Sequence, residues 1–209
     1  MRTAYIKNDL NRCDLCLKNL RELNRKYGAK FVLNIYYTTE DGFELPQFSD
    51  RYKGQWRDNA HWLKLAFHAH ADSPNRPYQY APPSKLLADL DRIDAEIVRF
   101  AGEETLSPPT VIHWGMVPPA ALRPLYERGV RVLSGLFEPR NGVFDVHYFL
   151  DDDRCEYVMR NGLLKDFASG IVFSKADLVR NNTPVERIGP TLEPLLMGSW
   201  GLWNRESGG

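Results

Sequence analysis

Residues 63–101 read LKLAFHAHADSPNRPYQYAPPSKLLADLDRIDAEIVRFA and predict a strand, a loop and a helix in that order. The run Leu63–Ala69 is short and almost wholly apolar, which is typical of a strand covered on both faces in a parallel sheet. From Ser84 to Ala101 the apolar residues recur at helical spacing, and Gly102 follows as an end signal. One strand–loop–helix unit of this kind indicates an α/β protein.

The same alternation continues in both directions along the chain. We predict further strands at 31–37, 110–114, 130–137, 143–150 and 170–179, and further helices at 10–27, 50–62, 118–126, 151–160 and 183–196. Repeated strand–helix units favour a mostly parallel sheet with right-handed crossovers. The turn PRNG before the strand at 143–150 predicts one antiparallel hairpin with the strand that precedes it.

The length of the chain limits the architecture. We expect one domain over residues 1–209, with 197–209 as a surface tail. Because a complete (β/α) barrel usually has about 250 residues, a distorted or incomplete barrel is the predicted form.

Composition excludes several classes of function. Lys and Arg total 27 and Asp and Glu total 27, so the net charge is zero and bulk electrostatics predict no nucleic-acid or membrane partner. The chain has no apolar run of about eighteen residues and no apolar leader near Met1, so we expect a cytoplasmic protein. Cys13 and Cys16 lie on the apolar face of a predicted helix, where packing is the favoured interpretation over a zinc or redox pair.

Histidines gather where the predicted strands end. His68 and His70 end the second strand and His113 ends the third, while Asp72 and Asp177 also lie near strand ends. In parallel α/β folds functional groups collect at the carboxyl ends of strands. Since residues i and i+2 of an extended segment point the same way, His68 and His70 are predicted to face one centre. Imidazole with carboxylate suits zinc or another divalent ion, although strand-end histidines can instead be hydrogen-bonded to loops.

Aromatic residues beside these histidines suggest a ligand surface. Trp114, Tyr78 and Arg76 are the candidate contacts to a sugar, since aromatic faces stack on carbohydrate rings. Packing in the core or in a loop is the alternative for each of them. His61 and His147 are interpreted as structural or exposed.

Four segments carry a resemblance to a known family. They are KYGAKFVLNIYY from Lys26, FSDRYKGQWRDNAHWLKLAFHAHAD from Phe48, EIVRFAGEETLSPPTVIHWG from Glu96 and IVFSKADLV from Ile171. These segments resemble bacterial polysaccharide-deacetylase-like proteins of the glycoside hydrolase/deacetylase superfamily, over roughly residues 15 to 185. The resemblance implies a distorted (β/α) barrel.

The resemblance also implies a chemistry. Active members of that superfamily deacetylate N-acetylated sugars with a divalent metal held by one Asp and two His, and a second Asp is the general base. His68 matches the first metal histidine, Asp72 stands where the second is expected, and His70 is an additional candidate. The Asp-Asp pair of the first strand and the final catalytic histidine have no counterpart in this sequence.

The resemblance therefore implies a metal-dependent hydrolase of N-acetyl or O-acetyl sugars, intact or degenerate. The metal, zinc by preference, is expected at His68, His70 and Asp72, and His113 and Asp177 are the expected catalytic residues. A non-catalytic carbohydrate-binding relative is the first alternative. A metal-dependent barrel hydrolase of the amidohydrolase or phosphoesterase type is the second, although those families place their H-x-H on the first strand.

Overall fold

The structure is a computed structural model and describes residues 20–176, of which those up to Lys175 belong to one compact unit. Residues 20–27 are helical. The strands, α-helices and 3-10 turns (η) that follow are β1 (Phe31–Tyr36), η1 (Leu45–Gln47), α3 (Lys53–Asp58), β2 (Leu63–Ala69), α4 (Pro83–Phe100), η2 (Glu103–Thr105), β3 (Pro109–Thr110), η3 (His113–Gly115), η4 (Pro119–Ala121), α5 (Leu122–Glu127), β4 (Val132–Gly135), β5 (Pro139–Arg140), β6 (Val143–Phe144), α6 (Asp152–Asn161), β7 (Leu163–Lys165) and β8 (Val172–Lys175).

The strands form three groups with mostly parallel pairing. β1 pairs in parallel with β2, and a second sheet has the order β3-β4-β8-β7, in which only β7 is antiparallel to its neighbour. β5 and β6 form a small antiparallel hairpin. The predicted α/β class is therefore confirmed. Within residues 20–176 the strands do not close into a barrel.

Side chains join the two larger sheets where β2 meets β3. The hydroxyl of Thr110 on β3 donates to the carbonyl oxygen of Phe67 on β2. Oδ1 of Asn34 on β1 accepts a hydrogen bond from the backbone N–H of Val111 and shares the Thr110 hydroxyl proton with the Phe67 carbonyl, each at 3.2 Å from Oδ1. These contacts bring the carboxyl ends of β1, β2 and β3 together.

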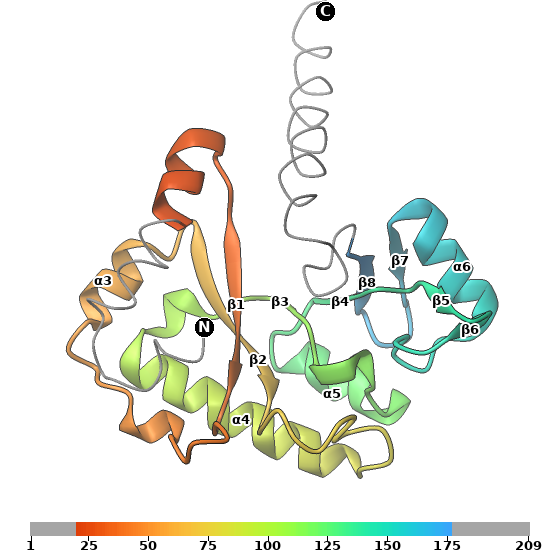
Figure 1. The fold of residues 1–209 in the computed structure, drawn as a ribbon, viewed down its shortest axis with the longest axis horizontal. Helices are drawn as coiled ribbons and strands as arrows, with labels where there is room; N and C mark the ends of the chain where they lie inside the picture. The colour runs from red at the N-terminus through yellow and green to blue at the C-terminus, as the bar shows by residue number, and fades with distance from the viewer. Residues whose placement is uncertain (1–19, 177–209) are drawn as a thin grey trace, which may run out of the picture. The chain divides into compact units, whose positions relative to one another are not determined.

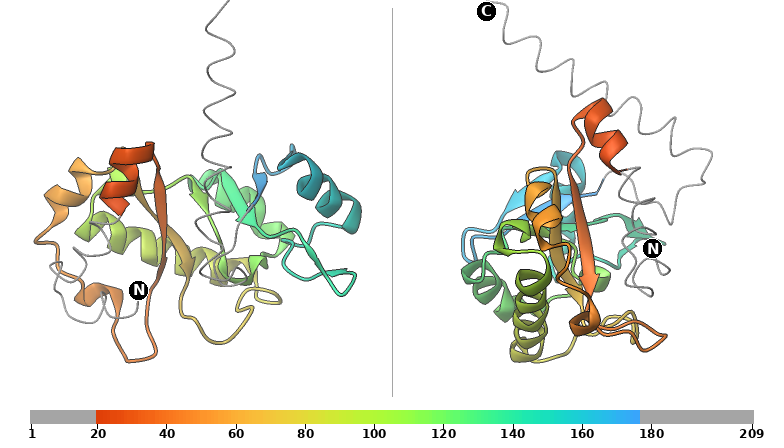
Figure 2. Two further views of the ribbon diagram at one scale, coloured as in Figure 1. Left: turned by 45° about the horizontal axis from the view of Figure 1, so that its top comes forward. Right: turned by 90° about the vertical axis from the view of Figure 1, so that its left-hand side faces the viewer.

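Helix α4 lies across one face of the β1–β2 pair (Figures 1 and 2). Its apolar stripe of Leu86, Leu90, Ile93 and Ile97 is almost wholly buried. Burying a side chain of this size contributes about 1.5–3 kcal/mol, so this stripe anchors the helix to the sheet. No helix within residues 20–176 combines the length and the apolar content that crossing a membrane requires.

Two predicted strands are much shorter in the structure. The strand predicted at 110–114 ends at Thr110, and His113–Gly115 forms the turn η3, because Trp114 has a left-handed φ of 60°. The strand predicted at 143–150 is reduced to β6, because Tyr148 and Phe149 have φ angles of 53° and 58°. The antiparallel hairpin after the turn PRNG is confirmed. Its first strand is β5, and not the strand predicted at 130–137, which contains β4.

Other element boundaries also differ from the predictions. α3 is shorter than the helix predicted at 50–62, since it begins at Lys53 and ends at Asp58. α6 agrees with the prediction, and Asp151 caps it by accepting a hydrogen bond from the backbone N–H of Arg154. β7 was not predicted. The predicted helix at 183–196, the tail at 197–209, Asp177, Cys13 and Cys16 lie outside the described residues.

Candidate functional site

Four polar side chains meet where β1 and β2 end and η3 begins. Nε2 of His68 lies 3.3 Å from Nδ1 of His113. The Tyr36 hydroxyl oxygen lies 3.0 Å from that Nδ1 atom and donates a hydrogen bond of 2.9 Å to Oδ1 of Asp72. We call His68, His113, Tyr36 and Asp72 the two-histidine site.

A β-bulge places His68 in this site. Ile35 pairs with Phe67, but the next residue, Tyr36, pairs with Ala69, so His68 is the extra residue on β2. A bulge of this kind turns the side chain away from the regular alternation of the strand. The ring of His68 then packs edge-to-face on Tyr36, with 4.8 Å between the ring centroids.

Backbone carbonyl groups determine the tautomer of both histidines. Nδ1 of His68 contacts the carbonyl oxygen of Val111, and Nε2 of His113 lies 3.0 Å from the carbonyl oxygen of Asp72. Since a carbonyl oxygen only accepts hydrogen bonds, each of these nitrogens carries a proton. In the neutral rings, the remaining nitrogens have no proton, and these are the two that face each other.

Burial keeps the two imidazoles neutral. Loss of solvent lowers the pKa of His68 to about 4, against smaller raising effects from the Val111 carbonyl and the Asp72 charge. Burial is also the main cause of a lowered pKa at His113. For Tyr36, burial and then the Asp72 carboxylate raise the pKa of the hydroxyl, so it stays protonated. The site at neutral pH thus holds three acceptors and one hydroxyl proton.

This arrangement fits a divalent cation. Neutral imidazole nitrogens are preferred zinc ligands, and two of them at 2.0–2.1 Å from a tetrahedral zinc are about 3.3–3.4 Å apart, as the facing nitrogens of His68 and His113 are. Their outer nitrogens bond backbone carbonyls, as ligating histidines usually do. No group of three or more His, Cys, Asp or Glu side chains placed for a metal occurs within residues 20–176. The further donors beside the imidazoles are therefore the Tyr36 hydroxyl and, behind it, Asp72.

His70 does not join the site, although the i, i+2 spacing predicted that it would. β2 ends at Ala69, and the bulge at His68 breaks the alternation on which that prediction rested. The ring of His70 stacks instead on Tyr37, with 5.2 Å between centroids and 17° between planes. Its Nδ1 lies 3.9 Å from a carboxylate oxygen of Asp89. The structure thus brings together His68, Asp72 and His113, but not His70.

Tyr78 lies beneath the surface and not on it. Its side chain is fully buried. The hydroxyl donates to Asp89 Oδ2 and accepts from the backbone N–H of His70, both at 3.0 Å. These contacts give Tyr78 a structural role in the loop after β2 and leave no part of it open to a ligand.

Trp114 and Arg76 lie beside the two-histidine site. The Trp114 and His113 rings are 6.3 Å apart between centroids, and the Trp114 indole N–H donates to Asn75 Oδ1 at 3.2 Å. The Arg76 guanidinium lies 5.5 Å from the Trp114 ring centroid and pairs with Asp145. Trp114 is half-buried.

The loop after β6 holds the turn that carries His113. The backbone N–H of Tyr148 donates to the carbonyl oxygen of Gly115 at 2.6 Å, and the Tyr148 hydroxyl donates to the Ser134 carbonyl at 2.6 Å. Gly115 has a φ of 57°, and an added Cβ would lie 2.6 Å from Val146. Only glycine fits this position, and the close packing holds η3 in place.

Tyr36 is a site residue that the sequence analysis missed. It is the last residue of β1, so it satisfies the same strand-end rule that identified His68 and His113. The hydroxyl group alone did not identify Tyr36 as a site residue, because tyrosine at a strand end is far more often part of the core.

The fold and the site together define the class of this protein: a mixed α/β protein with paired, neutral imidazoles at the ends of parallel strands. Comparison of the chain with protein-family models, with curated proteins and with solved structures found no match. A function is therefore inferred from the geometry of the site.

Proposed function

We propose that this protein is a metal-dependent hydrolase of the carbohydrate-deacetylase type, acting on N-acetyl or O-acetyl sugars and built on an incomplete (β/α) barrel. The observation that carries this proposal is the pair of unprotonated nitrogens of His68 and His113, 3.3 Å apart and facing each other. Two facing lone pairs repel unless a cation lies between them. The lowered pKa values of both rings disfavour a proton in that role at neutral pH, which favours a metal ion.

His68 and His113 would hold the ion, with Tyr36 and Asp72 beside it. A divalent ion polarises a carbonyl oxygen and lowers the pKa of a water molecule, which is the chemistry that acetyl hydrolysis needs. Zinc is the preferred ion because both nitrogen ligands are neutral imidazoles. In this assignment His113 is a metal ligand, whereas the sequence analysis expected it to be catalytic.

Asp72 is the base that the site offers. Its Oδ1 accepts the Tyr36 hydroxyl proton at 2.9 Å, and its backbone carbonyl orients His113 at 3.0 Å. A carboxylate in this position can take a proton from an attacking water, a role that contributes about 10²–10⁴-fold to the rate of a hydrolase. Tyr36 holds that carboxylate in place and supplies a hydroxyl donor next to the imidazoles.

Neighbouring groups support a neutral sugar as the ligand. Trp114 offers part of its ring beside His113, and pairing with Asp145 neutralises Arg76. The net charge of the chain is zero, which favours an uncharged partner over nucleic acid or an anionic membrane. We place the protein in the cytoplasm, because an odd number of cysteines is not typical of the disulfide frameworks of secreted proteins.

Zinc content and acetate release test the proposal together. The purified protein is stripped of metal, reloaded with zinc, dialysed and assayed on N-acetylglucosamine oligomers. We expect one zinc per chain and release of acetate, both lost in His68→Ala and in His113→Ala. His70→Ala is the matched control and should keep both, since His70 faces Tyr37 instead.

Other outcomes identify the alternatives. A protein that binds no zinc but binds the oligomers, and loses them in Trp114→Ala, is a carbohydrate-binding module. A protein that binds zinc and cleaves phosphate esters or cyclic amides, but releases no acetate, belongs to the amidohydrolase or phosphoesterase class. Either outcome overturns the deacetylase assignment.

A further inference from the structure

A cavity of about 290 Å³ lies between α4, β2 and the loops that lead into β3 and β4. Its walls are more apolar than polar, and the apolar part includes Leu65, Phe67, Leu90, Leu106 and Val130. No residue of the two-histidine site lines it. Small-molecule sites have volumes of about 300–1,000 Å³, so this cavity has room for a small ligand.

Asp94 of α4 presents a carboxyl group to this cavity. No hydrogen bond or ion pair joins that carboxyl group to a residue within 20–176, and the side chain is partly buried. Burial, followed by the charge of Asp91, raises the pKa of Asp94 to about 7. Partial burial of a carboxylate without a partner disfavours its charged form, so this group favours either a proton or a cation.

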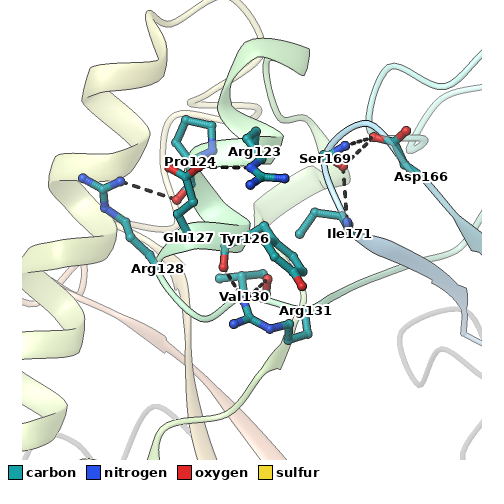
Figure 3. Close-up of polar contacts among 10 residues, drawn as sticks. All are labelled: Arg123, Pro124, Tyr126, Glu127, Arg128, Val130, Arg131, Asp166, Ser169 and Ile171. Carbon is teal, nitrogen blue, oxygen red and sulfur yellow. Dashed lines mark hydrogen bonds and ion pairs between the residues drawn. The ribbon is translucent and has the colours of Figure 1, made fainter.

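Arg128, which also lines the cavity, is neutralised by an ion pair with Asp91. Arg128 donates from Nε and Nη2 to the two carboxylate oxygens of Asp91, at 2.7 and 3.3 Å. Its Nη1 also donates to the carbonyl oxygen of Pro124 at 3.4 Å, and Figure 3 draws this contact. The exposed Glu103 adds a second negative charge at the edge of the cavity and makes no ion pair with any residue described.

Charge and shape together define what the cavity would bind. The lining parts of β2 and β3 present no titratable group, so the unpaired charges that face the cavity are those of Asp94 and Glu103. We propose that this cavity binds a small organic ammonium ion, whose charged nitrogen pairs with Asp94 while its apolar part packs on Leu65, Leu90 and Val130. The walls favour the apolar part by about 25 cal/mol for each Å² removed from water. The inference is independent of the deacetylase proposal.

Binding of an ammonium ion here depends on pH with a defined sign. The ion pairs with Asp94 only when that carboxyl group is ionised, so affinity should rise as the pH increases through about 7. For a group with that pKa, the ionised fraction at pH 8.5 is about 30 times that at pH 5.5. Affinity should change by up to the same factor.

Phenethylammonium is a suitable probe, since it stays charged at both pH values and carries one apolar ring. Isothermal titration calorimetry of the whole chain should detect its binding at pH 8.5, and binding up to about 30-fold weaker at pH 5.5. Asp94→Asn should weaken binding at pH 8.5 at least tenfold. Asp58→Asn is the matched control, because it makes the same change in charge on an exposed residue of α3 that does not line the cavity.

Ligands that differ only in charge test the pairing with Asp94 on the unaltered chain, even if Asp94→Asn does not fold. The neutral 2-phenylethanol and the anionic 3-phenylpropionate have the same ring, and both should bind the unaltered chain far more weakly at pH 8.5. His68→Ala should bind phenethylammonium normally, which separates this cavity from the two-histidine site. Absence of binding at millimolar concentration, equal binding of the alcohol, or full affinity in folded Asp94→Asn would each overturn the inference.

Discussion

Nε2 of His68 lies 3.3 Å from Nδ1 of His113, although the two residues are 45 positions apart in the chain. Each ring directs its other nitrogen to a backbone carbonyl oxygen, that of Val111 for His68 and that of Asp72 for His113. The two nitrogens that face each other therefore carry no proton in the neutral rings. The facing pair of nitrogens governs both the binding of zinc and the dependence of stability on pH.

Tyr36→Phe should weaken zinc binding without unfolding the protein. The change removes the hydroxyl that lies 3.0 Å from His113 Nδ1 and donates to Asp72, while the ring that packs on His68 remains. Loss of a supporting polar group at a metal site typically costs about 10–100-fold in affinity. Titration against a chromophoric chelator measures the effect, and Tyr37→Phe is the control because Tyr37 contacts His70 instead. Equal affinity in the two variants would contradict the assigned role of Tyr36.

The metal-free protein should lose stability as the pH falls from about 6.5 to about 4 because of His68. Burial lowers the pKa of His68 to about 4 in the folded state, so the unfolded chain takes up a proton first and unfolding becomes easier. The contribution is at most about 3.5 kcal/mol, at about 1.4 kcal/mol for each unit of pKa difference.

Denaturant titrations across this pH range measure that contribution as a difference between two proteins. His68→Gln lacks the titrating ring but keeps the other acidic and basic groups of the chain. The difference in unfolding free energy between the unaltered protein and His68→Gln should therefore decrease as the pH falls. A difference that stays constant from pH 7 to pH 4 would show that His68 titrates normally.

Gly115→Ala should destabilise the protein, whereas Gly54→Ala should not. Gly115 has a φ of 57° and its added Cβ would lie 2.6 Å from Val146, so the left-handed backbone alone costs about 1–2 kcal/mol and the contact adds to it. Gly54 lies in α3 with open space around it, and alanine there should stabilise the helix by about 0.5–1 kcal/mol. Urea denaturation compares the two variants, and a similar effect from both would contradict the packing of η3.

Tyr78→Phe should lower stability while leaving zinc binding unchanged. The change removes the donor to Asp89 and the acceptor for the backbone N–H of His70, both within a buried environment. Leaving buried polar groups without partners costs about 1–3 kcal/mol. Thermal denaturation and zinc titration together measure the outcome. Loss of zinc at unchanged stability would mean that Tyr78 belongs to the site after all.

Elements with strong local patterns were predictable from the sequence. β2 has the predicted bounds, and α4 begins one residue before the predicted start and ends one residue before the predicted end. The apolar run of β2 and the regular stripe of α4 are patterns of neighbouring residues, which local sequence records directly. The helix predicted at 151–160 likewise agrees with α6 to within one residue, and its cap Asp151 acts only on the first turn of the helix.

Short apolar runs near the site were not predictable in this way. Residues 110–114 and 143–150 have the composition of strands, yet the backbone is left-handed at Trp114, Tyr148 and Phe149. That conformation is held by contacts between Gly115 and residues more than thirty positions later, such as the hydrogen bond from Tyr148. Strand propensity is easily overridden by packing of this kind.

The sequence by itself determined the α/β class of the protein. It also located the candidate site at the strand ends that carry His68, His113 and Asp72, because the strand-end rule depends only on the order of elements along the chain. Only the tertiary structure decided that Tyr36 completes the site and that His70 faces Tyr37. One extra residue in β2 makes that difference, since a single bulge reverses the side to which every following side chain points.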